Sequence, residues 1–244
     1  MPKSERVRRS CLYGDKAFSL VEVIVAMAAG LFLLAAALHA VLYFQREFGR
    51  QHDQLVQQQD VRLGLELFGQ EIRLAGSGSF SVVRSDFVEF TANVSGLMTS
   101  VTATAVTGLT TLVVEDGRGW PDNKLVSVCW NEHCDRFTLA RAGQRNVLTF
   151  MEPMPRPIPS GASVTVMNRI RYYSRPDERG ILRWLRQIDG GASVIAGHIA
   201  GFALRYWDAQ GRPTTNPDLV HRVLIQISVP GKSVIESREF SLRT

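Results

Sequence analysis

The hydrophobic pattern of the chain begins with one long apolar run. Residues 18–44 are almost entirely apolar, and the part from Val23 to Phe44 carries no formal charge. A run of this length is long enough to cross a bilayer as a helix. The preceding residues 3–16 carry five basic side chains against two acidic ones, and positive charge on that side predicts a cytoplasmic N-terminus.

The helical pattern continues beyond the apolar run. No proline occurs between Gln45 and Ala75, and apolar residues recur there at spacings of four and three, as one face of a helix requires. These residues are Val61, Leu65, Phe68, Ile72 and Ala75. With Gly76 and Gly78 as stop signals, we expect one helix from about Phe18 to Leu74, on the order of 85 Å long.

Glycines within this predicted helix lower its local propensity. They occupy positions 30, 49, 64 and 69. Gly49, near the membrane exit, allows a bend or partial melting, or is simply tolerated in a straight helix.

After Phe80 the pattern changes to that of strands and turns. Alternating or β-rich runs are separated by turn residues such as Asp116-Gly117 and Asp189-Gly190-Gly191. The runs are residues 87–94, 109–115, 125–129, 136–140, 147–150, 163–173, 181–186, 202–207, 220–229 and 234–242. The expected fold class is α+β: a long N-terminal helix, transmembrane and then amphipathic, packed against a mostly antiparallel β-sheet head.

One carboxylate interrupts the apolar run. Glu22 lies at the start of the predicted membrane-spanning segment, where burying an unpaired carboxylate near hydrocarbon costs several kcal/mol. It therefore needs either a partner or a function. The alternative is that Glu22 merely lies at the headgroup interface.

The sequence around Glu22 resembles the class III signal of type IV prepilins and of type II secretion pseudopilins. The matching residues are Lys16-Ala17-Phe18-Ser19-Leu20-Val21-Glu22 after a basic leader. The resemblance implies that prepilin peptidase cleaves between Ala17 and Phe18, that Phe18 becomes the N-methylated N-terminus, and that Glu22 pairs with the N-terminal amine of its own or a neighbouring subunit. The one departure is Ala17, where the family nearly always has glycine. An uncleaved membrane anchor is the alternative.

This resemblance divides the chain into four segments. Residues 1–17 would be the leader peptide, and residues 18–44 the half of the helix that lies in the membrane or in the filament core. Residues 45–76 would be the amphipathic half of the helix, and residues 77–244 a β-rich periplasmic or extracellular head.

Later segments more loosely resemble PilW-type minor pilins and the related J-type minor pseudopilins. They include Gln58-Gln59-Asp60-Val61-Arg62 leading into Glu71-Ile72-Arg73-Leu74-Ala75-Gly76, residues 170–183, residues 201–208 and residues 223–229. The resemblance implies a low-copy subunit that helps to start a filament and lies at or near its tip. Its partners would be prepilin peptidase, other minor pilins and the major pilin or other pseudopilins, and an inner-membrane assembly platform. Its location would be the inner membrane, single-pass with the head in the periplasm, and then the filament.

Two cysteines bracket a short predicted turn. Cys129 and Cys134 flank residues 130–133, a spacing that suits a cross-strand disulfide in an oxidising compartment, whereas Cys11 lies in the leader. Two alternatives remain: a metal site with His133, which lacks a fourth ligand, and a pair of reduced structural cysteines.

Composition and motifs predict a structural subunit and no enzyme. The formal net charge of +5 comes partly from the leader, and the basic residues form no stripe interleaved with aromatic side chains, so no nucleic-acid partner is predicted. No nucleophile motif, phosphate loop or HExxH sequence occurs, and we expect no cofactor and no metal. A remaining hypothesis of another class is a bitopic membrane protein whose β domain binds a ligand and which never assembles.

Overall fold

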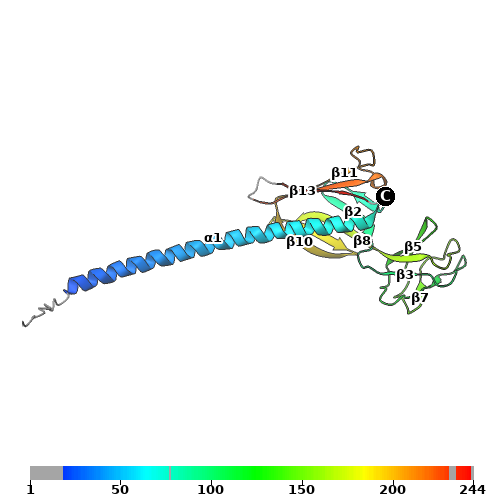
Figure 1. Ribbon diagram of the computed structural model, residues 1–244, viewed down its shortest axis with the longest axis horizontal. Helices are drawn as coiled ribbons and strands as arrows, with labels where there is room; N and C mark the ends of the chain where they lie inside the picture. The colour runs from blue at the N-terminus through cyan, green and yellow to red at the C-terminus, as the bar shows by residue number, and fades with distance from the viewer. Residues whose placement is uncertain (1–18, 77, 231–234, 243–244) are drawn as a thin grey trace, which may run out of the picture. The chain divides into compact units, whose positions relative to one another are not determined.

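The computed structural model describes residues 19–76, 78–230 and 235–242. The chain divides into two compact units, Met1–Gln54 and Leu55–Thr244. One helix, α1 (Leu20–Ala75), begins in the first unit and ends in the second (Figure 1). The predicted long helix is therefore confirmed. Its last residue lies one position beyond the expected Leu74, and Gly76 follows it with φ of 70°, as expected of a glycine that stops a helix.

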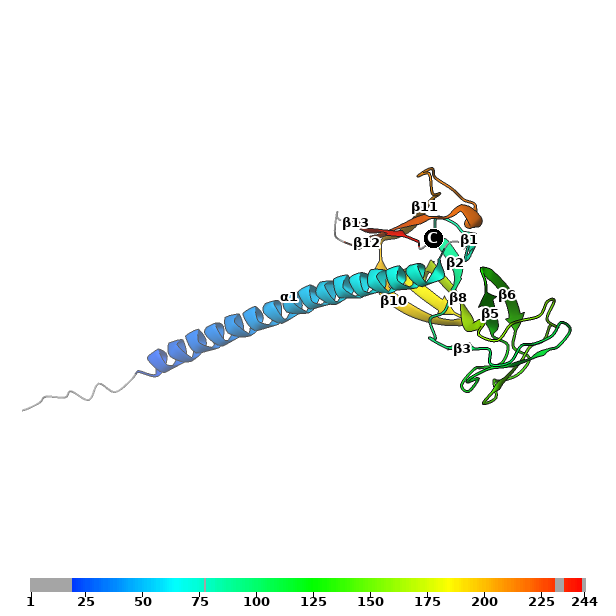
Figure 2. The same cartoon turned by 45° about the vertical axis from the view of Figure 1, so that its right-hand side comes forward.

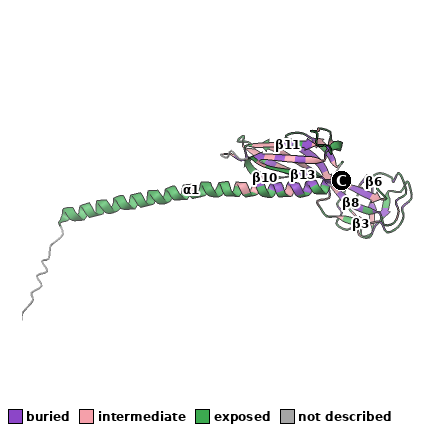
Figure 3. Cartoon of the chain, turned by 45° about the horizontal axis from the view of Figure 1, so that its top comes forward, coloured by how far each residue is buried: buried purple, intermediate pink, exposed green. Residues whose placement is uncertain are grey.

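In the first unit, α1 presents its apolar side chains outward. Figure 3 colours this half of the helix as exposed almost throughout. The chain remains helical through Gly30 and Gly49, as expected where such glycines are tolerated.

The second unit contains the end of α1 and a β-rich head in which all paired strands are antiparallel. The strands that the structure describes are β1 (Phe80–Val83), β2 (Phe87–Ala92), β3 (Met98–Ser100), β4 (Thr111–Val113), β5 (Leu125–Trp130), β6 (His133–Thr138), β7 (Val147–Thr149), β8 (Ser163–Pro176), β9 (Leu182–Ile188), β10 (Gly191–Ile199), β11 (Gly201–Trp207), β12 (Arg222–Ser228) and β13 (Ile235–Ser241). A 3-10 turn, η1 (Pro217–Leu219), precedes β12.

These strands form three sheets. The largest has the order β1-β2-β8-β5-β6, with β3 and β9 also paired with β8, and β10 paired with β9. A second sheet has the order β11-β12-β13, and β4 pairs with β7. Strand β8 is the common element of the large sheet, because one part of it pairs with β2 and β9 and the other with β3 and β5.

The head has two hydrophobic cores. We call residues 55–76, 78–94, 168–230 and 235–242 the first lobe, whose core joins the end of α1 to the β1-β2-β8-β9 region and to the β11-β12-β13 sheet. The second lobe, residues 97–166, encloses a separate core under β3 to β7 and the start of β8. Figure 2 shows β3, β5 and β6 grouped in this second lobe.

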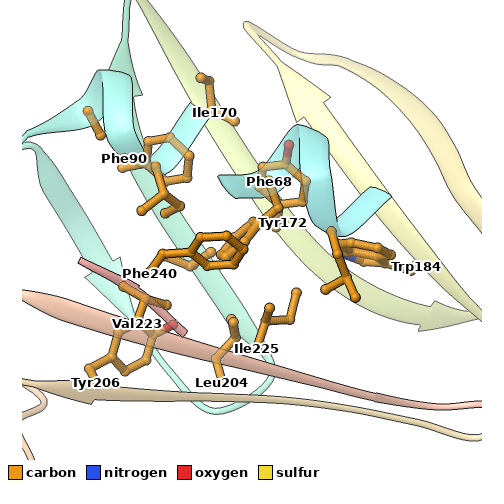
Figure 4. Close-up of a cluster of buried hydrophobic side chains, with 14 of the residues drawn as sticks. Phe68, Phe90, Ile170, Tyr172, Trp184, Leu204, Tyr206, Val223, Ile225 and Phe240 are labelled. Atoms are coloured by element: carbon orange, nitrogen blue, oxygen red, sulfur yellow. The ribbon is translucent and has the colours of Figure 1, made fainter. Parts of the chain in front are cut away.

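Aromatic side chains from the helix and both sheets meet in the first core (Figure 4). Phe68 of α1 lies edge-on to Tyr172 of β8, with ring centroids 4.8 Å apart, and to Phe240 of β13, at 5.7 Å. The apolar face predicted for this part of the helix is confirmed, because all five of its residues are buried.

Two glycines let α1 approach its neighbours closely. A Cβ atom at Gly64 would lie 2.3 Å from Ile195 and 2.4 Å from Trp184, and one at Gly69 would lie 2.2 Å from Phe240. Real Cβ atoms do not approach other atoms this closely. The low helix propensity of Gly64 and Gly69 is therefore offset by close packing that a residue with a Cβ atom would not permit.

Candidate functional site

The candidate site at the N-terminus is organised by the first turn of α1. The Glu22 amide donates a hydrogen bond to the Ser19 carbonyl at 3.0 Å and lies 3.4 Å from the Ser19 hydroxyl oxygen. A serine three residues before a glutamate at a helix start is the spacing of a capping box. The helix therefore begins directly after Ser19, and Glu22 lies in its first turn, where a negative charge interacts favourably with the helix dipole.

The carboxylate of Glu22 is exposed and available. Within residues 19–76, 78–230 and 235–242, no side-chain hydrogen bond or ion pair reaches this carboxylate. The predicted cleavage and methylation residues, Ala17 and Phe18, lie outside the described residues. The structure thus gives the helix position of Glu22 and leaves its pairing with an amine as a prediction.

The surface that follows Glu22 is apolar on all sides. An 18-residue window of α1 has a mean hydropathy of 2.4, and none of it is buried within the chain, so by length and composition this helix could cross a membrane. Phe32 and Leu33 are 79% and 73% exposed. Such a continuous apolar surface requires lipid or other apolar helices around it.

A buried ionic network fastens the other end of α1 to the head. Glu71 is only 3% exposed; its carboxylate accepts a hydrogen bond from the Tyr172 hydroxyl and two from the Arg186 guanidinium, one of them 3.1 Å long. Burial, together with the Glu71 carboxylate, raises the pKa of the Tyr172 phenol far above its usual range, so this hydroxyl stays a donor. Sequence reasoning missed Glu71, although a carboxylate three residues after Phe68 on the apolar face was a usable signal.

Asp189 joins the two lobes of the head. Its carboxylate accepts hydrogen bonds from Lys124 at 2.6 Å, from the Asn168 amide group at 2.7 Å and from the Arg169 backbone at 2.8 Å. Lys124 belongs to the second lobe, and the other two residues lie where β8 passes from one lobe to the other. Although burial would raise the pKa of Asp189, these hydrogen bonds lower it below its usual value of 3.8.

The two candidate disulfide residues lie opposite each other in the β5–β6 hairpin. Cys129 and Cys134 are register partners with Cα atoms 4.1 Å apart, and their Sγ atoms are at bonding distance, 2.09 Å. The connecting residues, Asn131 and Glu132, both have positive φ angles, as a two-residue hairpin turn requires. No group of three or more potential metal ligands occurs among the residues whose positions are given.

The described chain thus combines an exposed apolar helix, which begins at an acidic first turn, with a β-rich head in which this helix ends. Residues 13–38 match the family model of the prokaryotic N-terminal methylation motif. This match, which includes Ala17, Phe18 and Glu22, supports placing the chain in the type IV pilin and pseudopilin superfamily. Searches of curated proteins and of solved structures each found no significant match.

Proposed function

We propose that this chain is a minor type IV pilin of the PilW kind. It is cleaved between Ala17 and Phe18 by prepilin peptidase, is N-methylated at Phe18, and takes part in pilus assembly initiation or in the tip complex. The observation that carries this proposal is the methylation motif at residues 13–38, located at the start of an exposed helix whose apolar run has no charge after Glu22. The family with this motif consists of structural subunits of the pilin type, and we assign no catalytic role.

In this proposal the chain has four segments. Residues 1–17 are removed, residues 18–44 move from the inner membrane into the filament core, residues 45–76 are the amphipathic half of α1, and residues 77–244 form a periplasmic head. The partners are prepilin peptidase, other minor pilins, the major pilin and the assembly platform in the inner membrane.

The role proposed for Glu22 follows from its place in the first turn. Cleavage would create an ammonium group at Phe18, four residues away and so about one helical turn from Glu22. In a filament core, an unpaired ammonium or carboxylate would be costly. A Glu22–ammonium pair, within one subunit or between neighbours, would therefore disfavour every docking register that leaves it broken.

The two-lobed head supports a minor rather than a bulk subunit. Subunits that repeat along a shaft must pack their heads at a short axial rise, and a second lobe of about 70 residues, 97–166, adds volume to each head. A tip position has free space above it, so a large head fits there.

Minor pseudopilins share the same motif, so a pseudopilus of a type II secretion system is the second candidate.

The experiment that tests processing is N-terminal sequencing and intact-mass measurement on the protein from native membranes and from sheared filaments. We expect a chain that starts at Phe18 and is one methyl group heavier than its sequence. A chain that retains residues 3–17 in both fractions would contradict the proposal and support the uncleaved anchor. Recovery with pili rather than with the secretion apparatus separates the first candidate from the second.

The matched experiment on assembly replaces Glu22 by alanine. We expect Glu22→Ala to accumulate in the membrane and to be lost from the sheared-filament fraction. The control is Asp53→Ala, which removes another exposed carboxylate from the same helix and should be incorporated normally. Normal incorporation of Glu22→Ala would show that this carboxylate has no role in docking.

A further inference from the structure

A groove in the first lobe lies between the end of β1 and strand β11. It has a volume of about 450 Å³ and is lined by residues 83–85, 204–207 and 213–215. Leu204 and Tyr206 are almost fully buried beneath it, and Trp207 is half-buried at its side. This groove is remote in sequence from the N-terminal motif, and the processing proposed above does not involve it.

One wall of the groove is fixed by hydrogen bonds to β11. The Leu204 amide donates to the Ser85 carbonyl at 2.8 Å, and the buried Tyr206 hydroxyl donates to the Arg84 carbonyl at 2.9 Å. The turn after β1 is therefore held in place before any ligand arrives.

The opposite wall is fixed by the loop after β11. The Thr214 amide donates to the Tyr206 carbonyl at 3.0 Å, and Trp207 forms a β-bridge with Pro213. Asp208 stabilises this loop, because its carboxylate accepts hydrogen bonds from the backbone amides of Gln210 and Arg212 at 2.9 and 2.8 Å. A groove with two rigid walls binds its ligand with little loss of conformational entropy.

The charge of the groove is positive. Arg84 and Arg205 are exposed in its lining, which contains no carboxylate. In the described part of the chain, neither guanidinium forms an ion pair, and Asp208 is already paired with Arg212 at 2.9 Å. Asp86 is exposed and is not part of the lining, but its carboxylate lies close enough that, with burial, its charge helps to raise the pKa of the Tyr206 phenol.

We propose that this groove binds an extended peptide segment of a partner protein in which acidic side chains alternate with apolar ones. The apolar side chains would pack on Leu204, Tyr206 and Trp207. The carboxylates would accept charge-assisted hydrogen bonds from the two free guanidiniums, whose planar geometry matches a carboxylate. An anionic membrane fits less well, because basic sites for lipid surfaces gather four to eight cationic side chains and this groove has two.

The test uses the full chain in nanodiscs of neutral phosphatidylcholine and measures fluorescence polarisation. The probe is a set of labelled octapeptides that alternate glutamate with leucine, phenylalanine or tyrosine, compared with the same set carrying glutamine. We expect the glutamate set to bind and the Arg84→Gln/Arg205→Gln variant to bind it about tenfold more weakly or worse. The control is Arg145→Gln/Arg179→Gln, which removes the same charge from exposed sites outside the groove and should bind normally.

A second readout locates the peptide. At a peptide concentration that saturates each protein, binding should change tryptophan emission in the unmodified chain, and this change should be lost in Trp207→Phe. No binding of the glutamate set, equal binding of the glutamine set, or equal weakening in the control variant would each overturn the proposal. So would binding of anionic phospholipid vesicles that requires Arg84 and Arg205 without any binding of the peptides. Because both arginines are exposed, circular dichroism should show the variants folded, and the single variant Arg205→Gln repeats the test.

Discussion

At the scale of single residues, glycine has opposite roles in the two halves of α1. A Cβ atom at Gly30 or Gly49 would meet nothing within 4 Å, whereas one at Gly64 or Gly69 would collide with buried side chains of the head. The helix propensity of glycine is equally poor at all four positions. Only the last two are required by packing.

This difference predicts the effect of Gly69→Ala. The new methyl group would meet the buried ring of Phe240, so we expect the free energy of unfolding to fall by about 1–3 kcal/mol. That loss should exceed the gain of about 1 kcal/mol from better helix propensity. Denaturant unfolding of the full chain in detergent, followed by near-ultraviolet circular dichroism, measures it. Gly49→Ala is the control and should be neutral or stabilising; equal stability of the two variants would contradict the packing argument.

The sequence predicted which residues of α1 face the core but not what they contact. Spacing alone identified Val61, Leu65, Phe68 and Ile72 as one face, and all four are buried. The need for glycine at position 64 comes from Trp184, which lies 120 residues later in the chain. The ion pair of Glu71 likewise depends on Arg186. Local periodicity contains no information on such distant neighbours.

At the scale of elements, the strands that sequence reasoning found were those with clear alternation or β-branched residues. β2, β8 and β12 lie within or close to their predicted runs. β1, β3 and β10 were missed. β3 has only three residues, and β10 combines two glycines with two alanines and changes register twice along β9, so neither shows a regular alternation.

The Asp189 contact between lobes predicts a pH dependence. Its pKa in the folded protein is lowered, so its contribution to stability is complete above the unfolded value of 3.8 and is lost as the pH falls through the lower folded value. We expect Asp189→Asn to be less stable than the unmodified chain at neutral pH and to lose less stability on acidification below about pH 4. Unfolding curves over this range measure both effects. Parallel loss in the two proteins would exclude Asp189 as a source of acid sensitivity.

The β5–β6 hairpin predicts the state of its cysteines. Because the closed loop is short, its disulfide would stabilise the head by only about 2 kcal/mol and would mainly fix the hairpin tip. In the proposed periplasmic form we expect Cys129 and Cys134 to resist alkylation in denaturant until a reductant is added. Cys129→Ser/Cys134→Ser should keep the fold and lower the thermal midpoint of unfolding by about 4–8 °C. Alkylation of both thiols without reductant would support the reduced alternative.

At the scale of the whole molecule, the two parts of the chain need different surroundings. The first half of α1 exposes apolar side chains that need lipid or other helices, and the head has two well-packed cores of its own. In our proposal, transfer of this chain from the membrane to a filament would exchange lipid contacts for helix contacts while the head stays folded. The step that commits the chain to this transfer is, in our proposal, cleavage before Phe18, because the charged leader would otherwise remain attached to the apolar helix.

The final prediction concerns the rate of that cleavage. Ala17 stands where the family has glycine, and its methyl group must fit a pocket that normally holds none. We therefore expect Ala17→Gly to speed cleavage and Ala17→Leu to block it. In our proposal the precursor has three cysteines and would lose Cys11 with the leader, so maleimide-polyethylene glycol labelling of reduced, denatured protein would separate it from a mature form with two.

A pulse-chase experiment with this label gives the rate for each variant. Gly14→Ala is the control, because Gly14 is the nearest glycine and a cut after it would leave Asp15 and Lys16 at the head of an apolar helix. If Gly14→Ala stopped processing and Ala17→Leu did not, the peptidase would be using Gly14. If all the variants matured at the unmodified rate, residue 17 would not limit processing, and the alanine would be a neutral departure from the motif.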